Sequence, residues 1–141
     1  MIRNILMETN PHNISTVISG SYRKHLTEIY NLKSFLENKG IAVLSPVGSH
    51  AINPGAEFVL LDADPIEDER LLQDSVFSKL RRSAFLVVMN KDQYLGKAAI
   101  MEIGYALALG MQILTAESVE DPNLKPYTRP LKEVFPDMPA I

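Results

Sequence analysis

Ala84-Phe85-Leu86-Val87-Val88-Met89 is the stretch that decides the fold, because it contains no polar side chain. An unbroken apolar run of this length is typical of a strand that is buried on both faces, as in a parallel sheet. Less uniformly apolar runs at 14–20, 41–46 and 111–115 predict three further strands. We therefore expect four strands, of which the third along the chain is the most buried.

Three segments with helical spacing of apolar residues separate these strands. They cover residues 24–39, 66–82 and 97–109. Strands that alternate with helices imply an α/β fold, in which helices cover both faces of a mostly parallel sheet as a three-layer sandwich. The length of 141 residues suits one domain over 1–141. The tail, 121–141, holds five prolines, so we expect irregular structure there with one short helix near 131–135.

Two segments do not follow this alternation. Residues 1–13 are predicted to be a polar lead-in rather than a signal peptide. Residues 47–65 contain several glycine, proline and aspartate residues within a partly apolar stretch, with a candidate short strand at 58–61. Long excursions in compact domains are usually functional or disordered, and we interpret this one as a flap over a site.

The composition excludes several classes of function. The chain has no cysteine, which excludes disulfides, thiolate catalysis and cysteine metal sites. The net charge of −3 gives no basic face for nucleic acid, and we interpret the cluster of Lys79, Arg81 and Arg82 as a solvated helix end rather than a phosphate-binding rail. No apolar run reaches the roughly 18 residues of a membrane helix, so we expect a cytoplasmic protein that contacts no membrane.

Ligands of parallel α/β sheets bind at the carboxyl ends of the strands, which directs attention to three loops. The first is Gly20-Ser21-Tyr22-Arg23, where helix N–H groups, the Ser21 hydroxyl and the Arg23 guanidinium could bind a phosphate or a sugar. Neither the dinucleotide-binding glycine spacing nor a P-loop is present. A plain turn with Ser21 as helix N-cap is an equally good interpretation, and both stay open.

The other two loops begin at Pro46 and at Asn90. The loop 90–96 contains Tyr94, an aromatic residue that could stack on a base, and ends at Gly96. His25 has no metal-ligand spacing with any carboxylate, so we expect a surface histidine and no metal site.

Two acidic residues are candidates for catalysis. Glu102 lies about one turn into the helix 97–109, beside an apolar stripe that contains Ile100 and Ile103, and a nearby helix N-terminus favours the ionised form suited to a nucleophile. Asp74 lies inside the helix 66–82, where aspartate is unfavourable. Two carboxylates near one glycosidic carbon are typical of glycosyl transfer. The alternative is that both are ordinary surface acids.

Together these pieces resemble the nucleoside 2-deoxyribosyltransferase superfamily over roughly residues 14–115. The matching segments are Val17-Ile18-Ser19-Gly20-Ser21-Tyr22-Arg23, Ala42-Val43-Leu44-Ser45-Pro46, Asp74, Phe85-Leu86-Val87-Val88-Met89-Asn90, Tyr94-Leu95-Gly96 and Met101-Glu102-Ile103-Gly104-Tyr105-Ala106 with Gly110. The resemblance implies a flavodoxin-like sheet, no metal or organic cofactor, and a homodimer or larger assembly.

The resemblance also implies an activity, the cleavage of the N-glycosidic bond of a nucleoside, a deoxynucleoside or a 5′-monophosphate. Glu102 would attack the anomeric carbon to form a covalent sugar ester, which water or another base resolves, while Asp74 would assist or orient the departing base. Arg23 favours a 5′-phosphate. The residues expected to bind substrate are Gly20, Ser21, Tyr22, Arg23, Pro46, Asn90, Tyr94 and Gly96.

The chain departs from the family pattern at two places. Gly96, Lys97, Ala98 and Ala99 stand where transferases often carry a second acidic residue, and Ser83-Ala84 stands where many members have an aspartate. These departures favour an alternative, a non-catalytic nucleotide-binding or sensor module that uses the same pocket. A phosphoribohydrolase of similar fold has less support, because its P-G-G-x-G-T block is absent.

Overall fold

The computed structural model of the chain describes residues 14–48, 51–56, 59–62 and 68–141. The predicted lead-in, 1–13, lies outside the described residues. So do 49–50, 57–58 and 63–67, which cover parts of the predicted flap and the predicted start of the second helix.

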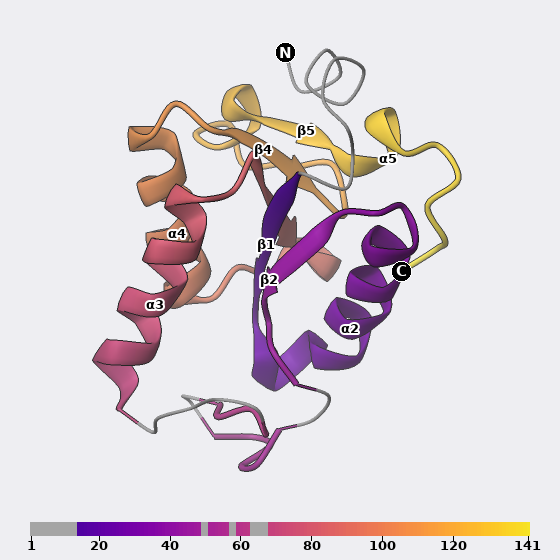
Figure 1. Cartoon of the computed structure of the whole chain (residues 1–141). Helices are drawn as coiled ribbons and strands as arrows, with labels where there is room; N and C mark the ends of the chain where they lie inside the picture. The colour runs from indigo at the N-terminus through magenta and orange to yellow at the C-terminus, as the bar shows by residue number, and fades with distance from the viewer. Residues whose placement is uncertain (1–13, 49–50, 57–58, 63–67) are drawn as a thin grey trace.

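Strands and helices alternate along the described chain (Figure 1). The elements are β1 (Ser15–Gly20), α2 (Tyr22–Asn38), β2 (Ala42–Ser45), α3 (Glu69–Arg81), β3 (Phe85–Met89), the 3-10 turn η2 (Lys91–Gln93), α4 (Lys97–Ala108), β4 (Gln112–Thr115), the 3-10 turn η3 (Lys125–Tyr127), β5 (Thr128–Pro130) and α5 (Leu131–Val134). The sheet is entirely parallel, in the order β2-β1-β3-β4-β5. The predicted α/β class is confirmed, and this strand order is flavodoxin-like.

Helices cover both faces of the sheet, as the sequence predicted. In Figure 1, α2 and α5 lie on one side of the strands, and α3 and α4 lie on the other. Alternate residues of a strand point to opposite faces. Accordingly, Phe85, Val87 and Met89 pack in the core that includes α2 and α5, whereas Leu86 and Val88 pack with α3 and α4. All five residues of β3 are buried, which confirms that this strand lies in the interior.

The fifth strand is a correction to the prediction of an irregular tail. Residues Thr128–Pro130 pair in parallel with β4 at the edge of the sheet, immediately before the predicted short helix, α5. A strand of three residues carries no readable alternation. Pro130 is tolerated because an edge strand needs hydrogen-bond donors on one side only.

The candidate strand at 58–61 is also corrected. In the described part of this segment, only one isolated antiparallel bridge forms, between Ala51 and Leu61. Asn53 completes a small loop, since its Oδ1 accepts a hydrogen bond of 2.6 Å from the Leu60 N–H. Val59 and Leu61 are nonetheless buried, so this excursion packs onto the domain.

Among the described residues, no helix has the length and apolar character needed to cross a membrane.

Replacing Gly20 with alanine is expected to lower the free energy of unfolding by about 1–3 kcal/mol. A Cβ at this position would lie 3.0 Å from Met89 Cβ and 3.1 Å from the Met89 carbonyl oxygen. Gly104 offers a matched control, because a Cβ there meets nothing within 4 Å, and alanine should stabilise the helix by up to about 1 kcal/mol. Urea unfolding of both variants checks the prediction, and equal midpoints would contradict it.

Candidate functional site

Two adjoining cavities lie at the carboxyl ends of β1, β2 and β3. Their volumes are about 400 Å³ and about 370 Å³. Five residues line both cavities, namely Gly20, Tyr22, Val59, Gln73 and Ala98. The sheet order reverses between β1 and β3, and parallel sheets of this kind bind ligands at such a reversal. The fold therefore places both cavities where a ligand site is expected.

Glu102 lines the smaller cavity and is almost completely buried, with 7% of its surface exposed. Ser19, near the end of β1, donates its hydroxyl hydrogen to Glu102 Oε1 over 2.5 Å. Gln73, on α3, donates from Nε2 to Glu102 Oε2 over 2.8 Å. The two carboxylate oxygens are therefore held by different elements on different sides.

Burial raises the pKa of Glu102, and the hydrogen bonds from Ser19 and Gln73 partly oppose this effect. The sequence led us to expect that the helix N-terminus would favour the ionised form. That expectation is corrected, because Glu102 is the sixth residue of α4 and the dipole effect falls off within the first turn. The predicted core stripe is confirmed at Ile103, which is buried, and corrected at Ile100, which is 46% exposed. Ala99 and Ala106 are buried on this helix as well.

The structure does not bring Asp74 to Glu102. Asp74 is exposed, lies 3.8 Å from Arg70 in an ion pair and lines neither cavity. Successive residues of a helix are turned by about 100°, so the side chain one position earlier, Gln73, faces the cavities. The predicted pair of carboxylates is therefore absent from the described site, and a neutral carboxamide stands beside Glu102.

The first loop lines the larger cavity with Gly20, Ser21, Tyr22 and Arg23, the residues predicted from the sequence to bind substrate. Ser21 is also the N-cap of α2, because its Oγ accepts a hydrogen bond of 3.2 Å from the Lys24 N–H. The two interpretations of this loop are compatible, since a capped helix N-terminus can still present other N–H groups to an anion.

The start of α4 lies on the same cavity. The lining residues are Gly96, Lys97, Ala98 and Ala99. Gly96 is the N-cap of α4, and no side chain caps the N–H groups of this helix. Arg23 and Lys97 are the only charged side chains among the described residues that line this cavity. Two cationic groups and two helix N-termini therefore meet there, an arrangement that favours an anionic ligand.

Tyr94 lines the larger cavity, but its ring already has neighbours. The Lys24 ammonium lies 3.9 Å from the ring centroid, and the His25 ring approaches edge-on with centroids 6.2 Å apart. A base could therefore stack only where Lys24 does not cover the ring. His25 is 7% exposed, which corrects the expectation of a surface histidine.

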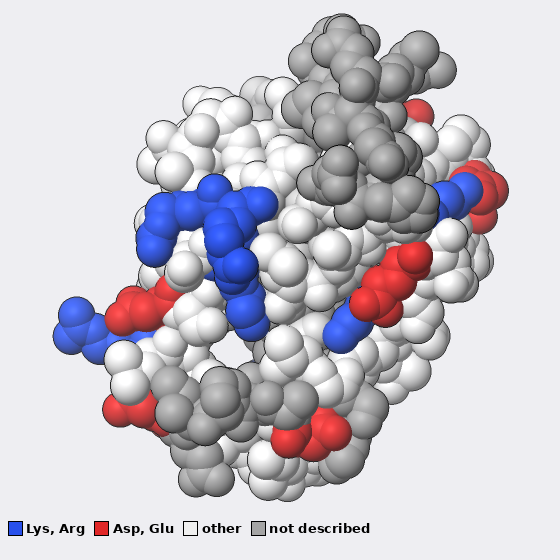
Figure 2. Space-filling view, viewed as in Figure 1, with Lys and Arg blue, Asp and Glu red and all other residues white. Residues whose placement is uncertain are grey.

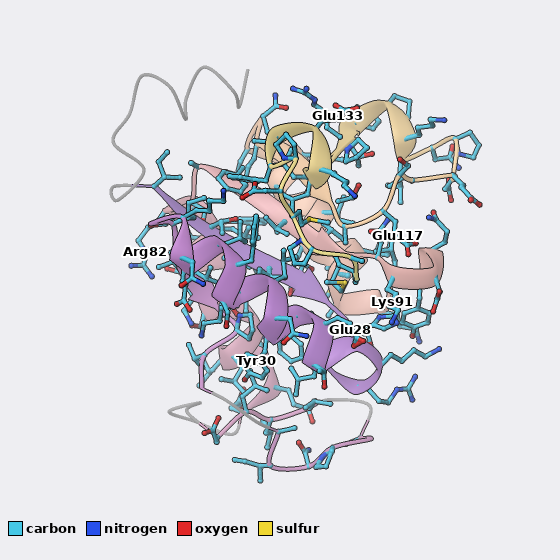
Figure 3. All side chains as sticks on the ribbon, turned by 90° about the vertical axis from the view of Figure 1, so that its right-hand side faces the viewer. Glu28, Tyr30, Arg82, Lys91, Glu117 and Glu133 are labelled. Carbon is cyan, nitrogen blue, oxygen red and sulfur yellow. The ribbon has the colours of Figure 1, made fainter. Side chains whose placement is uncertain are left out.

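Asn90 and Pro46 support the structure and line neither cavity. Asn90 Nδ2 donates to the Glu117 carbonyl over 2.9 Å, and the Glu117 N–H donates back to Asn90 Oδ1 over 2.8 Å, so the ends of β3 and β4 are joined. The neighbouring Lys91 lies 3.5 Å from Glu28 of α2, in the region labelled in Figure 3. Pro46 is buried, and its carbonyl accepts a hydrogen bond of 2.8 Å from Lys33 Nζ.

The basic cluster at the end of α3, Lys79, Arg81 and Arg82, lies partly on the surface and partly at the smaller cavity. Figure 2 shows Lys and Arg side chains gathered on the face that carries α3 and β2. Arg81 and Arg82 are exposed, as expected of a solvated helix end, whereas Lys79 is half-buried and lines the smaller cavity.

Sequence reasoning missed Ser19, Gln73, Lys79 and Lys97 as cavity or contact residues. Ser19 had a weak signal, because it is a polar residue near the end of an otherwise apolar strand. Gln73 had none, since a glutamine on an amphipathic helix is usually solvated.

No family model, curated protein or solved structure matches the chain. The structure shows the parallel flavodoxin-like fold, and the resemblance to the nucleoside 2-deoxyribosyltransferase superfamily stays a hypothesis.

Proposed function

We propose that the protein cleaves the N-glycosidic bond of a nucleoside, a deoxynucleoside or a 5′-monophosphate, with Glu102 as nucleophile. The observation that carries this proposal is a buried carboxylate that borders a ligand-sized cavity and is held by two hydrogen-bond donors. A carboxylate that attacks an anomeric carbon needs this fixed orientation, because reacting atoms must be held about 3–3.5 Å apart.

The chemistry proceeds in two displacements. An oxygen of ionised Glu102 forms a bond to C1′ while the bond from C1′ to the base nitrogen breaks, and the electron pair leaves with the base. Water or a second base then attacks C1′ and releases the free carboxylate, and the proton that the attacking group loses balances the one that the departed base takes up to become neutral. The raised pKa of Glu102 has two effects, since a more basic carboxylate is a stronger nucleophile but must first lose its proton.

The two cavities suit two parts of such a substrate. The larger one presents Arg23, Lys97 and two helix N-termini, which fit a 5′-phosphate. The smaller one has several apolar walls, which fit the flat faces of a base. These walls include Val47, Val59, Leu61, Leu72 and Val76.

Incubation with a panel of ribo- and deoxyribonucleosides and their 5′-monophosphates tests the proposal. Chromatographic detection of free base is expected for at least one member. Base release that requires an added acceptor base indicates a transferase, and release without one indicates a hydrolase. An intact panel after prolonged incubation would contradict the proposed function.

The alternative is a nucleotide-binding module without turnover. It is favoured by the observation that Glu102 is the only acidic side chain among the described residues that line the two cavities. Under this alternative, a monophosphate raises the melting temperature of the protein while no base is released.

We also propose that the protein is a homo-oligomer that associates through α4. Ile100 and Met101 are 46% and 52% exposed on this helix, and Met101 lines the larger cavity, so a second copy could close it.

Ile100→Arg is expected to yield monomers of 15.7 kDa in light scattering, whereas Tyr127→Arg, at an exposed position in η3, should leave the assembly intact. A wild-type protein with the mass of one copy would contradict this.

A further inference from the structure

We propose that Gln73 is a positioning residue that holds the Glu102 carboxylate for attack. The inference rests on the proposed function of Glu102 and assigns a task to a side chain that no sequence pattern singled out.

The two oxygens of Glu102 face different surroundings. Ser19, which holds Oε1, is 1% exposed and lines neither cavity. Gln73, which holds Oε2, lines both cavities. Oε1 is therefore the oxygen on the interior side, and Oε2 is the oxygen on the side from which a substrate arrives. The residue that fixes Oε2 sets the direction of attack.

The geometry leaves Oε2 able to react. A carboxylate oxygen has two lone-pair directions, and the Gln73 N–H occupies one of them over 2.8 Å. The second direction can point to an anomeric carbon in the cavity. Because a hydrogen bond restricts rotation of the carboxylate, Gln73 reduces the number of orientations in which Glu102 cannot attack.

The neutrality of Gln73 matters as much as its reach. A second carboxyl at this distance would share one proton with Glu102, because two negative charges so close together resist ionisation. A carboxamide donates to the charged form of Glu102 without competing for a proton. Gln73 therefore opposes the effect of burial, which raises the pKa of Glu102.

Other ionisable groups on the described cavity walls are cationic or phenolic. On the smaller cavity they are Lys79 of α3 and Tyr22 of α2, and β2 contributes the Ser45 hydroxyl. The Ser19 hydroxyl of β1 meets Glu102 from outside the cavity. On the larger cavity they are Tyr22, Arg23, Tyr94 and Lys97. None of these groups adds a negative charge near Glu102. The described side chains that hydrogen-bond directly to its carboxylate are Gln73 and Ser19.

The test is a titration of the Glu102 carboxyl carbon by NMR in protein with ¹³C-labelled glutamate, with the signal assigned from its loss in Glu102→Gln. Gln73→Met keeps the length of the side chain but removes the donor, and should raise the titration midpoint by about one pH unit. Gln73→Glu should raise it further and produce two coupled steps. Asp74→Asn is the matched control, since this exposed neighbour should leave the midpoint unchanged.

The pH profile of base release provides the second readout. In Gln73→Met the acid limb of kcat should move to higher pH by the same amount as the titration midpoint, which a purely structural role would not produce. An unshifted midpoint in both Gln73 variants overturns the inference whether or not base is released. If the midpoint shifts in the Gln73 variants but the wild-type protein releases no base, the role of Gln73 on Glu102 is supported and only the proposed function is contradicted.

Discussion

Glu102→Gln is expected to reduce base release by at least about 10⁴-fold in kcat while the protein remains folded. A carboxamide nitrogen or oxygen is a poor nucleophile and cannot form the sugar ester. The substitution keeps the volume of the side chain. Its hydrogen bonds can also be kept, because Oε1 can still accept from Ser19 and the Gln73 amide can turn to present its oxygen to the new amide nitrogen.

The same substitution is expected to stabilise the fold at neutral pH. The folded-state pKa of Glu102 is raised above its unfolded value, so the folded state binds the proton more tightly. Below the unfolded pKa, Glu102 is protonated in both states and glutamine gives no advantage of this kind. As the pH rises through the raised folded pKa, the wild type carries the cost of a buried charge that the variant lacks. The difference in free energy of unfolding should therefore grow with pH and then level off.

Urea unfolding at acid and neutral pH measures this difference, and base release from the best substrate of the panel measures the catalytic effect. Glu37→Gln makes the same chemical change at an exposed position of α2, and should alter neither quantity. Turnover that survives in Glu102→Gln would show that the nucleophile is another group. Loss of turnover together with lower stability at every pH would indicate a folding defect instead.

The central strand was predictable because its burial on both faces is written in six consecutive apolar residues. β3 can be recognised without alternation of polar and apolar residues. Its neighbours β1 and β4 are predicted because helical segments separate them from β3 along the chain, which is typical of parallel strands. β5 was not predictable for the opposite reason. It exists only because three residues add to the exposed edge of β4, and no periodic pattern encodes an edge contact of that length.

The candidate site was predictable in position but not in partners. Strand–helix alternation placed Glu102 and the first loop at one edge of the sheet, and the structure brings both to adjoining cavities. The partner of Glu102 depends on the rotation of α3, where one residue turns the side chain by about 100°. The apolar positions of that helix are too widely spread to fix this rotation, since even its apolar Leu71 is 52% exposed. The side chain that faces Glu102 is therefore Gln73 and not the predicted Asp74.

The raised pKa of Glu102 was also beyond what the sequence could predict. Its distance from a helix N-terminus can be read from the sequence, but its burial cannot, because burial depends on α3 and β1 closing over it from residues 29 and 83 positions away. Desolvation then outweighs the two hydrogen bonds from Ser19 and Gln73, so the pKa of Glu102 is raised.

Arg23→Ala is expected to lower kcat/KM for a 5′-monophosphate by about 100-fold, and for the corresponding nucleoside by no more than several-fold. Arg23 lines the larger cavity beside the start of α2, where a phosphate would receive its guanidinium hydrogens together with helix N–H groups. A nucleoside places no negative charge there, so it loses little when the arginine is removed. Lys132→Ala removes one positive charge in α5 and controls for net charge.

The comparison between the two ligands isolates the phosphate, because both share the same base, sugar and scissile bond. If Arg23 binds the phosphate, raising the salt concentration should weaken the monophosphate more than the nucleoside in the wild type, and this difference should shrink in Arg23→Ala. Equal losses for both ligands would mean that Arg23 acts on the sugar or on the shape of the first loop. The larger cavity would then have to be reassigned to another part of the substrate, although Glu102 could still be the nucleophile.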